Sequence, residues 1–144
     1  MNKADVMQAE MPGMPLKDSE DMVLYKDSLF GYPGEVEFIF SRESLKAVVY
    51  RVSVERYDAD DYLKRLHGML KSKYGEKYTR FGIHRWREGS ITLIEEKHSQ
   101  SLAVTLIYSE QPLESISAPA IGQLLQTMKE IEKNQVQLDF DHKL

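Results

Sequence analysis

The sequence predicts an α+β fold: a two-layer sandwich in which helices cover one face of an antiparallel sheet of about six strands. Two observations predict it. Several short segments alternate apolar and polar residues and are separated by a few turn residues, which is typical of antiparallel hairpins. Two other segments repeat apolar residues at intervals of three and four, which is the spacing of an amphipathic helix.

Length and composition limit the classes of function. The 144 residues fit a single domain that can bury a core without disulfides or metal. The chain contains no cysteine, which excludes disulfides, thiolate metal sites and a cysteine nucleophile. Its net charge of −4 argues against broad binding to nucleic acids or anionic membranes. No apolar run approaches the roughly 20 residues of a membrane helix, so no membrane span is expected.

The N-terminal segment leaves the compartment open. Residues 1–7 have neither the apolar stretch nor the cleavage site of a secretory leader, so the chain as written predicts a cytoplasmic protein. If a leader has been removed, the protein belongs to the envelope or is secreted. The absence of cysteine fits both alternatives.

The first half of the chain predicts a helix followed by three strands. The helix is expected over residues 3–10, with Asn2 as its N-cap, and the prolines and glycine of residues 11–15 end it. The strands are expected over residues 22–25, 35–40 and 45–55. The last strand is the most regular, and its alternating valines predict one buried face.

The second half predicts the same order. Asp58 is expected to open a helix over residues 59–74, with leucines along one face, and Gly75 suits the left-handed position that ends a helix. The strands are expected over residues 81–87, 91–96 and 101–108. Short gaps between them favour hairpins.

The two halves share one plan. Residues 2–55 and 58–109 each read as a helix and three strands, and their last strands are alike in sequence, Ser-Leu-Lys-Ala-Val-Val-Tyr against Ser-Leu-Ala-Val-Thr-Leu-Ile-Tyr. We therefore interpret residues 1–109 as a pseudo-duplicated domain.

Residues 110–144 are expected to form a C-terminal helix and tail. The helix is predicted over residues 118–133, where an apolar stripe begins just after a proline. It either packs across the edge of the sheet or projects as an element that binds a partner. Residues 135–140 alternate like an edge strand, but we expect a loose tail there.

Several short motifs carry a resemblance. They are Met-x-Lys-x-x-Val at Met1–Val6, Tyr-Lys-x-x-Leu-x-Gly-Tyr at Tyr25–Tyr32, Leu-x-x-Lys-Tyr-Gly at Leu70–Gly75, and a strand with Trp86. The chain resembles small uncharacterised bacterial proteins with tandem helix–β-meander repeats. Their architecture is that of β-lactamase-inhibitor proteins and of BamE-like outer-membrane-assembly lipoproteins. The resemblance covers about residues 1–109 and implies an envelope location and a protein-binding role.

No motif for catalysis, a metal or a cofactor is recognised. The four histidines, His67, His84, His98 and His142, include no pair at helical i, i+4 spacing and no HExxH. His84 and His98 could face each other across hairpins, but we interpret them as polar strand and turn residues. The acidic cluster Asp58, Asp60 and Asp61 is explained by the start of a helix, without a cation. We therefore predict no catalytic residues, no metal and no cofactor.

One segment, residues 78–87, is both basic and aromatic. On a strand, Arg85 and Arg87 would share one face, and His84 and Trp86 the other. Such a face can stack nucleic-acid bases, but neighbouring glutamates and the acidic chain argue against it. Trp86 is expected to pack in the core, with a role as an anchor for a protein partner as the alternative.

These observations favour a non-enzymatic protein-interaction module that binds its partner through an open sheet face. The partner-binding residues predicted are Phe30, Tyr32, Tyr57, Arg85, Trp86 and Arg87. Exposed aromatic residues should then cluster on that face. The alternative is a small-molecule-binding protein or enzyme with an apolar pocket between sheet and helices, with His67 or His84 pointing into it. The oligomeric state is left open.

Overall fold

The structure, a computed structural model, describes residues 2–9 and 14–143. The helices are α1 (Lys3–Ala9), α2 (Arg56–Tyr74) and α3 (Pro119–Lys143). The strands are β1 (Lys17–Ser19), β2 (Met22–Leu29), β3 (Tyr32–Ser41), β4 (Ser44–Glu55), β5 (Tyr78–Arg80), β6 (Ile83–Trp86), β7 (Ile91–Lys97) and β8 (Ser101–Ser109). Two short 3-10 turns are η1 (Arg87–Gly89) and η2 (Leu113–Ser115). The predicted α+β class is confirmed.

All strands pair antiparallel in one sheet, in the order β1-β2-β3-β4-β8-β7-β6-β5. The chain therefore runs as a helix and a four-strand meander, twice, and the last strands of the two meanders pair at the centre. Val52 of β4 lies opposite Val104 of β8 at this junction. Long central strands with apolar residues on both faces explain why β4 and β8 lie in the middle.

The sheet has eight strands, so the expectation of about six was wrong. The two additional strands, β1 and β5, form its outer edges; each has three residues, all exposed. Neither has an alternating pattern, because an exposed edge strand buries no face. The strand expected over residues 81–87 is shorter and covers only Ile83–Trp86, since Phe81 and Gly82 form a turn with positive φ angles of 53° and 80° and Arg87 begins η1.

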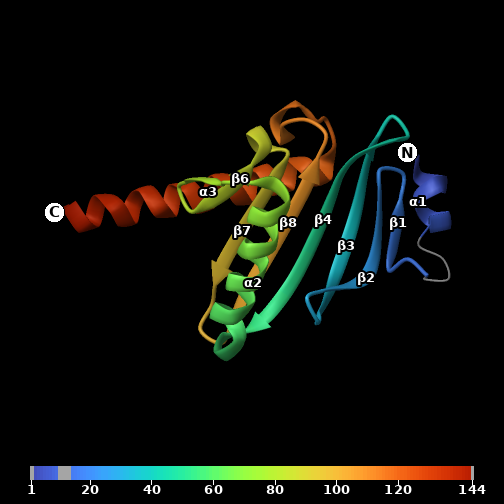
Figure 1. Cartoon of the computed structure of the whole chain (residues 1–144). Coiled ribbons are helices and arrows are strands. Elements are labelled where there is room, and N and C mark those ends of the chain that lie inside the picture. Colours follow the sequence, from blue (N-terminus) through green and yellow to red (C-terminus); the bar gives the residue numbers. More distant parts are fainter. Residues whose placement is uncertain (1, 10–13, 144) are drawn as a thin grey trace.

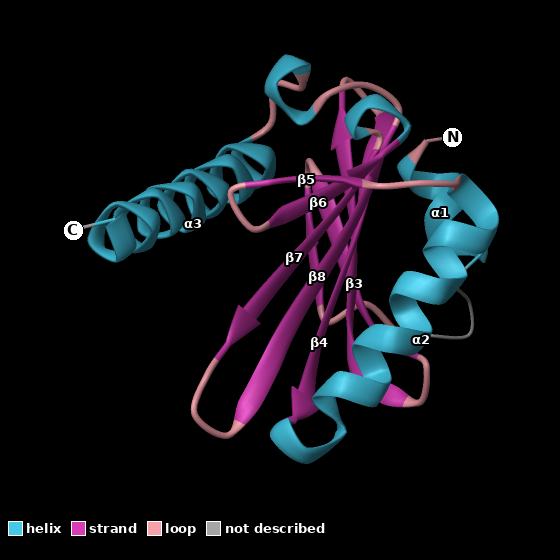
Figure 2. Ribbon diagram, turned by 60° about the vertical axis from the view of Figure 1, so that its left-hand side comes forward, coloured by secondary structure: helices cyan, strands magenta, loops and turns pink. Residues whose placement is uncertain are grey.

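Helices cover both faces of the sheet, so the fold has three layers and not the two that we predicted. Figure 2 shows α1 and α2 on one side of the sheet and α3 on the other. Apolar residues on both faces of β4 explain the third layer: Val52 and Val54 pack towards α2, whereas Ala47 and Val49 pack towards α3. A sheet with two apolar faces must bury both of them.

One core lies under α2. Residues of four strands pack there against Ala59, Tyr62, Leu66 and Leu70 of the helix. Trp86 is 1% exposed within this core, which confirms the expectation that it packs there. Under α1 a smaller cluster gathers around Val6, the one buried residue of that helix.

The C-terminal helix differs from its prediction in length and position. It continues to Lys143, so residues 135–140 are helical and form neither a tail nor a strand. Ile121, Leu124 and Met128 bury its first half against the sheet. Figure 1 shows the rest of α3 extending past the edge of the sheet. The helix thus packs across a face of the sheet with its first half and projects beyond the sheet with the rest.

Most predictions for the helix ends are confirmed. Asn2 caps α1, because its side-chain oxygen accepts a hydrogen bond from the Asp5 backbone at 2.9 Å. Gly75 follows α2 with a φ of 87°. The start of α2 was placed too late: the helix begins at Arg56, so Asp58 lies in its first turn and is not its cap. No described helix is long and apolar enough to cross a membrane.

Candidate functional site

Three polar side chains that are distant in the sequence meet on the α2 face of the sheet. His67 comes from the middle of α2, His84 from β6 and Glu95 from β7. His84 lies opposite Leu93, and Glu95 follows Leu93 by two positions, so both strand residues point to the same face. We call His67, His84 and Glu95 the histidine–glutamate cluster.

Both imidazole rings bind the same carboxylate. Nε2 of His67 lies 2.8 Å from Oε1 of Glu95, and Nε2 of His84 lies 2.9 Å from Oε2. The two rings are nearly perpendicular, at 87°, with their centroids 4.9 Å apart. The ligand atoms of the three residues all lie within 4.8 Å of one another. The carboxylate thus uses both oxygens to hold two histidines in one orientation.

The outer ring nitrogens have partners as well. Nδ1 of His67 lies 2.8 Å from the Lys77 ammonium, and Nδ1 of His84 lies 2.7 Å from the Thr79 hydroxyl. An ammonium group can only donate, so Nδ1 of His67 accepts and the ring proton is on Nε2, directed at Glu95. A hydroxyl donates or accepts, so Thr79 fits either protonation state of His84.

Glu95 is ionised in this setting. Burial acts to raise the pKa of its carboxyl group, but hydrogen bonds from His67 and His84 outweigh this effect and lower the pKa to about 2. The three side chains remain accessible, with 21%, 15% and 15% of their surface exposed for His67, His84 and Glu95. The cluster therefore opens at the surface and is not sealed in the core.

The sequence analysis did not predict the histidine–glutamate cluster. The partner of His84 is His67, on a helix, and not His98, which is exposed beyond the end of β7. The available signal was positional: His67 follows Leu66 in the apolar stripe of α2, while His84 and Glu95 alternate with the residues of the opposite face. Glu95 and Glu96 point to opposite faces, as alternation predicted.

Three of the six predicted partner-binding residues lie at one end of the molecule, which we call the hairpin end and define by Phe30, Tyr32 and Tyr57. The ring centroids of Phe30 and Tyr32 lie 6.2 Å and 5.4 Å from that of Tyr62. The Tyr32 hydroxyl donates a hydrogen bond to Asp58, which raises the pKa of Tyr32 to about 12. Tyr57 lies in the first turn of α2 and is 82% exposed, and Phe30 is 36% exposed.

The other three predicted residues lie elsewhere and apart from one another. Trp86 is buried under α2, with its ring centroid 6.1 Å from that of His67. The guanidinium of Arg87 lies 5.0 Å from the ring centroid of Tyr74, on η1 and not on a strand. Arg85 points to the opposite face of the sheet. The six residues therefore do not form one continuous surface, and Trp86 is not exposed to a partner.

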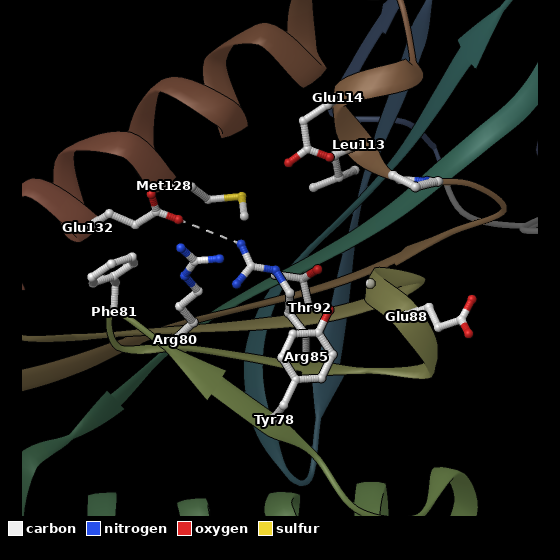
Figure 3. Close-up of a pocket in the computed structure, with 12 residues that line it drawn as sticks. Tyr78, Arg80, Phe81, Arg85, Glu88, Thr92, Leu113, Glu114, Met128 and Glu132 are labelled. Atoms are coloured by element: carbon white, nitrogen blue, oxygen red, sulfur yellow. Dashed lines mark ion pairs between the residues drawn. The ribbon is translucent and has the colours of Figure 1, made fainter.

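Arg85 lines a pocket of about 430 Å³ between the edge of the sheet, η2 and α3 (Figure 3). Its guanidinium lies 3.7 Å from the carboxylate of Glu132 on α3. The neighbouring Arg80 stacks over Phe81 at 5.2 Å. Five of the twelve lining residues are charged, and neither His67 nor His84 belongs to the lining. This pocket is not the apolar cavity with an inward histidine that the alternative function predicts.

The α3 face of the sheet is covered only in part. Beside α3 lies a groove of about 540 Å³, with Glu35, Arg51, Ala103 and Thr105 on its floor. Arg51 pairs with Glu37 at 2.9 Å, and Glu37 is 6% exposed. We call this groove the open part of the sheet face. Pro33 also lines it, so the β2–β3 hairpin borders both the groove and the hairpin end.

Known proteins do not place this chain in a family. No family model, no curated protein and no solved structure matches it. The resemblance to the BamE-like and inhibitor-protein architectures therefore stays a prediction from the sequence motifs. Function has to be argued from the geometry of the surfaces and of the histidine–glutamate cluster.

Proposed function

We propose that the protein is a non-enzymatic interaction module that binds a protein partner through the hairpin end and the adjoining open part of the sheet face. The observation that carries the proposal is the exposure of Tyr57, at 82%, at the same end of the molecule as exposed Phe30. Large aromatic side chains at the surface are typical of the residues that dominate binding energy at protein interfaces.

The support around these residues favours a rigid contact surface. Tyr62 stacks edge-to-face with both Phe30 and Tyr32, and its hydroxyl donates to the Leu29 carbonyl oxygen at 3.1 Å. The hydrogen bond from Tyr32 to Asp58 ties the hairpin to the first turn of α2. Because these contacts fix the hairpin before binding, little conformational entropy is lost when a partner docks.

We also propose that residues 2–55 and 58–109 are two copies of one unit. The support is the order of elements, a helix and an antiparallel meander in each, and the pairing of the last strands β4 and β8 at the centre of the sheet. The resemblance described from the sequence motifs points to the same plan and to a protein-binding role in the envelope.

The experiment compares immobilised wild type with Tyr57→Ala and Phe30→Asn, using cytoplasmic and envelope fractions of the source cells. Asparagine tolerates the positive φ of 53° at position 30 and removes the ring. The control is Tyr78→Ala, which removes an exposed tyrosine from β5. Circular dichroism and thermal melting first establish that each variant is folded.

The expected result is one protein retained by wild type and Tyr78→Ala, with at least tenfold weaker retention by Tyr57→Ala or Phe30→Asn. Retention of the same proteins by all four would contradict the proposal, because the hairpin end would then contribute nothing. Retention of no protein from either fraction would also contradict it.

A further inference from the structure

We propose that the histidine–glutamate cluster binds a divalent transition-metal ion, with Zn²⁺ as the representative, through Nε2 of His67, Nε2 of His84 and the carboxylate of Glu95. This site is separate from the interaction surface proposed above. Two imidazoles and one carboxylate are a ligand set that suits zinc and its neighbours in the first transition row.

The geometry needs only small side-chain movements to accept an ion. Zinc binds imidazole nitrogen and carboxylate oxygen at about 2.0–2.2 Å, so two ligand atoms of a tetrahedral site lie roughly 3.4 Å apart. One ligand atom from each of the three residues already lies within 4.8 Å of the other two. Nε2 of His67 lies 2.8 Å from one Glu95 oxygen, and Nε2 of His84 lies 2.9 Å from the other. Both short separations involve Glu95, so rotation about its side-chain bonds can lengthen them towards the zinc geometry.

The backbone holds these ligands on rigid elements. His84 and Glu95 lie on paired strands of the sheet, and His67 lies in the interior of a helix of 19 residues. Trp86 packs beside the His67 ring and limits its movement. Three protein ligands leave a fourth position, and the partial exposure of all three side chains puts that position at the surface. An ion can therefore enter without unfolding the core.

The two outer partners make opposite contributions. When Nε2 of a neutral histidine binds an ion, the ring proton lies on Nδ1 and needs an acceptor. The Thr79 hydroxyl, 2.7 Å from Nδ1 of His84, can accept it. The Lys77 ammonium, 2.8 Å from Nδ1 of His67, cannot accept a proton and also repels a cation. Lys77 is exposed and must swing away, so it competes with the ion.

This competition gives a signature that a purely structural role of the cluster does not share. Lys77→Gln removes the competing ammonium and should strengthen metal binding severalfold. The control is Lys71→Gln, which makes the same change of charge on the last turn of α2, where Lys71 pairs with Glu76 at 3.2 Å. It should leave the affinity unchanged. Both lysines are exposed, so neither variant threatens the fold.

The experiment titrates the full chain with Zn²⁺ and with Ni²⁺, following bound metal by equilibrium dialysis. Trp86 is the one tryptophan of the chain, so quenching of its fluorescence by Ni²⁺ reports binding near His67. We expect one ion per chain at this site, at least tenfold weaker binding by His67→Asn and by Glu95→Gln, and no change for His98→Asn, a histidine outside the cluster.

Two results would overturn the proposal. The first is the absence of saturable binding by wild type, or binding that His67→Asn and Glu95→Gln do not weaken. The second is an affinity that Lys77→Gln fails to raise above that of Lys71→Gln. Since the lysine variants keep all three ligands and the core, this comparison remains decisive even if Glu95→Gln fails to fold.

Discussion

On one face of the sheet α2 buries side chains from its first turn to its last, whereas on the other face α3 buries Ile121, Leu124 and Met128 in its first half and then extends past the sheet. A fully docked helix forces polar residues along its buried side to find partners, and His67 does so with Glu95. A partly docked helix leaves part of the sheet open as a groove. The histidine–glutamate cluster and the open part of the sheet face therefore lie on opposite faces of the sheet.

The largest expected effect is the loss of packing under α2. Leu66 is fully buried, at 0% exposure, in the core between α2 and the sheet. Leu66→Ala should lower the free energy of unfolding by about 2–5 kcal/mol, because it removes buried apolar atoms and leaves a cavity. Urea denaturation measures the change. A loss below about 1 kcal/mol would show that α2 is not the better-docked helix.

The matched substitution under α3 should cost less. Leu124→Ala removes the same atoms, but Leu124 is 6% exposed and borders the groove, so solvent can occupy part of the space. We expect the free energy of unfolding to fall by about 2 kcal/mol, as measured by the same urea denaturation. A loss equal to that of Leu66→Ala would remove the difference between the two faces.

A smaller effect with its own pH dependence is expected at Tyr62. Tyr62→Phe removes the hydroxyl that donates to the Leu29 carbonyl oxygen and should cost about 1 kcal/mol at neutral pH. Burial raises the pKa of Tyr62 to about 12 from its ordinary 10, so the unfolded state loses its proton first. The folded state therefore holds the Tyr62 proton more tightly than the unfolded state does. This contributes to the free energy of unfolding fully below pH 10, and the contribution is lost as the pH rises from 10 to 12.

The variant should therefore lose stability less steeply than wild type across that alkaline range, as measured by chemical denaturation at a series of pH values. A profile as steep as that of wild type would show that the Tyr62 hydroxyl titrates alike in the folded and unfolded states.

The smallest effects are expected at the two helical glycines. A Cβ added at Gly68 of α2 or Gly122 of α3 meets no atom within 4 Å. Gly68→Ala, in a helix interior, should raise the free energy of unfolding by about 0.5–1 kcal/mol, since alanine loses less backbone entropy on folding. Gly122→Ala lies close to the start of α3 and should raise the free energy of unfolding by less. Thermal melting compares the two, and a destabilised Gly68→Ala would contradict the packing described for α2.

The sequence predicted the elements whose burial is one-sided or whose ends carry local signals. The valines of β4, the leucine stripe of α2 and Gly75 belong to this group, because period and turn chemistry are local properties. The edge strands β1 and β5 could not be predicted, since exposed strands bury no face. The length of α3 was missed because its later turns lack the apolar stripe that marks its beginning.

The candidate site was predictable only in part. The exposure of Tyr57 fits its predicted place at the surface. The burial of Trp86 agrees with the expectation that it packs in the core, but not with its prediction as a partner-binding residue. The histidine–glutamate cluster was missed because it depends on register: β6 must pair with β7, and α2 must cross both strands. The spacing between residues 67, 84 and 95 in the sequence predicts neither the strand pairing nor the position of α2. A polar residue at a core-facing strand position was the one available sign.

The most direct test of the account is a crystal of the full chain soaked in zinc, with anomalous scattering measured at the zinc edge. We predict one strong peak between the rings of His67 and His84, at about 2.0–2.2 Å from both Nε2 atoms and from a Glu95 carboxylate oxygen, with Lys77 turned away. A crystal in which zinc occupies other positions, while both histidines keep their hydrogen bonds to Glu95, would contradict the account.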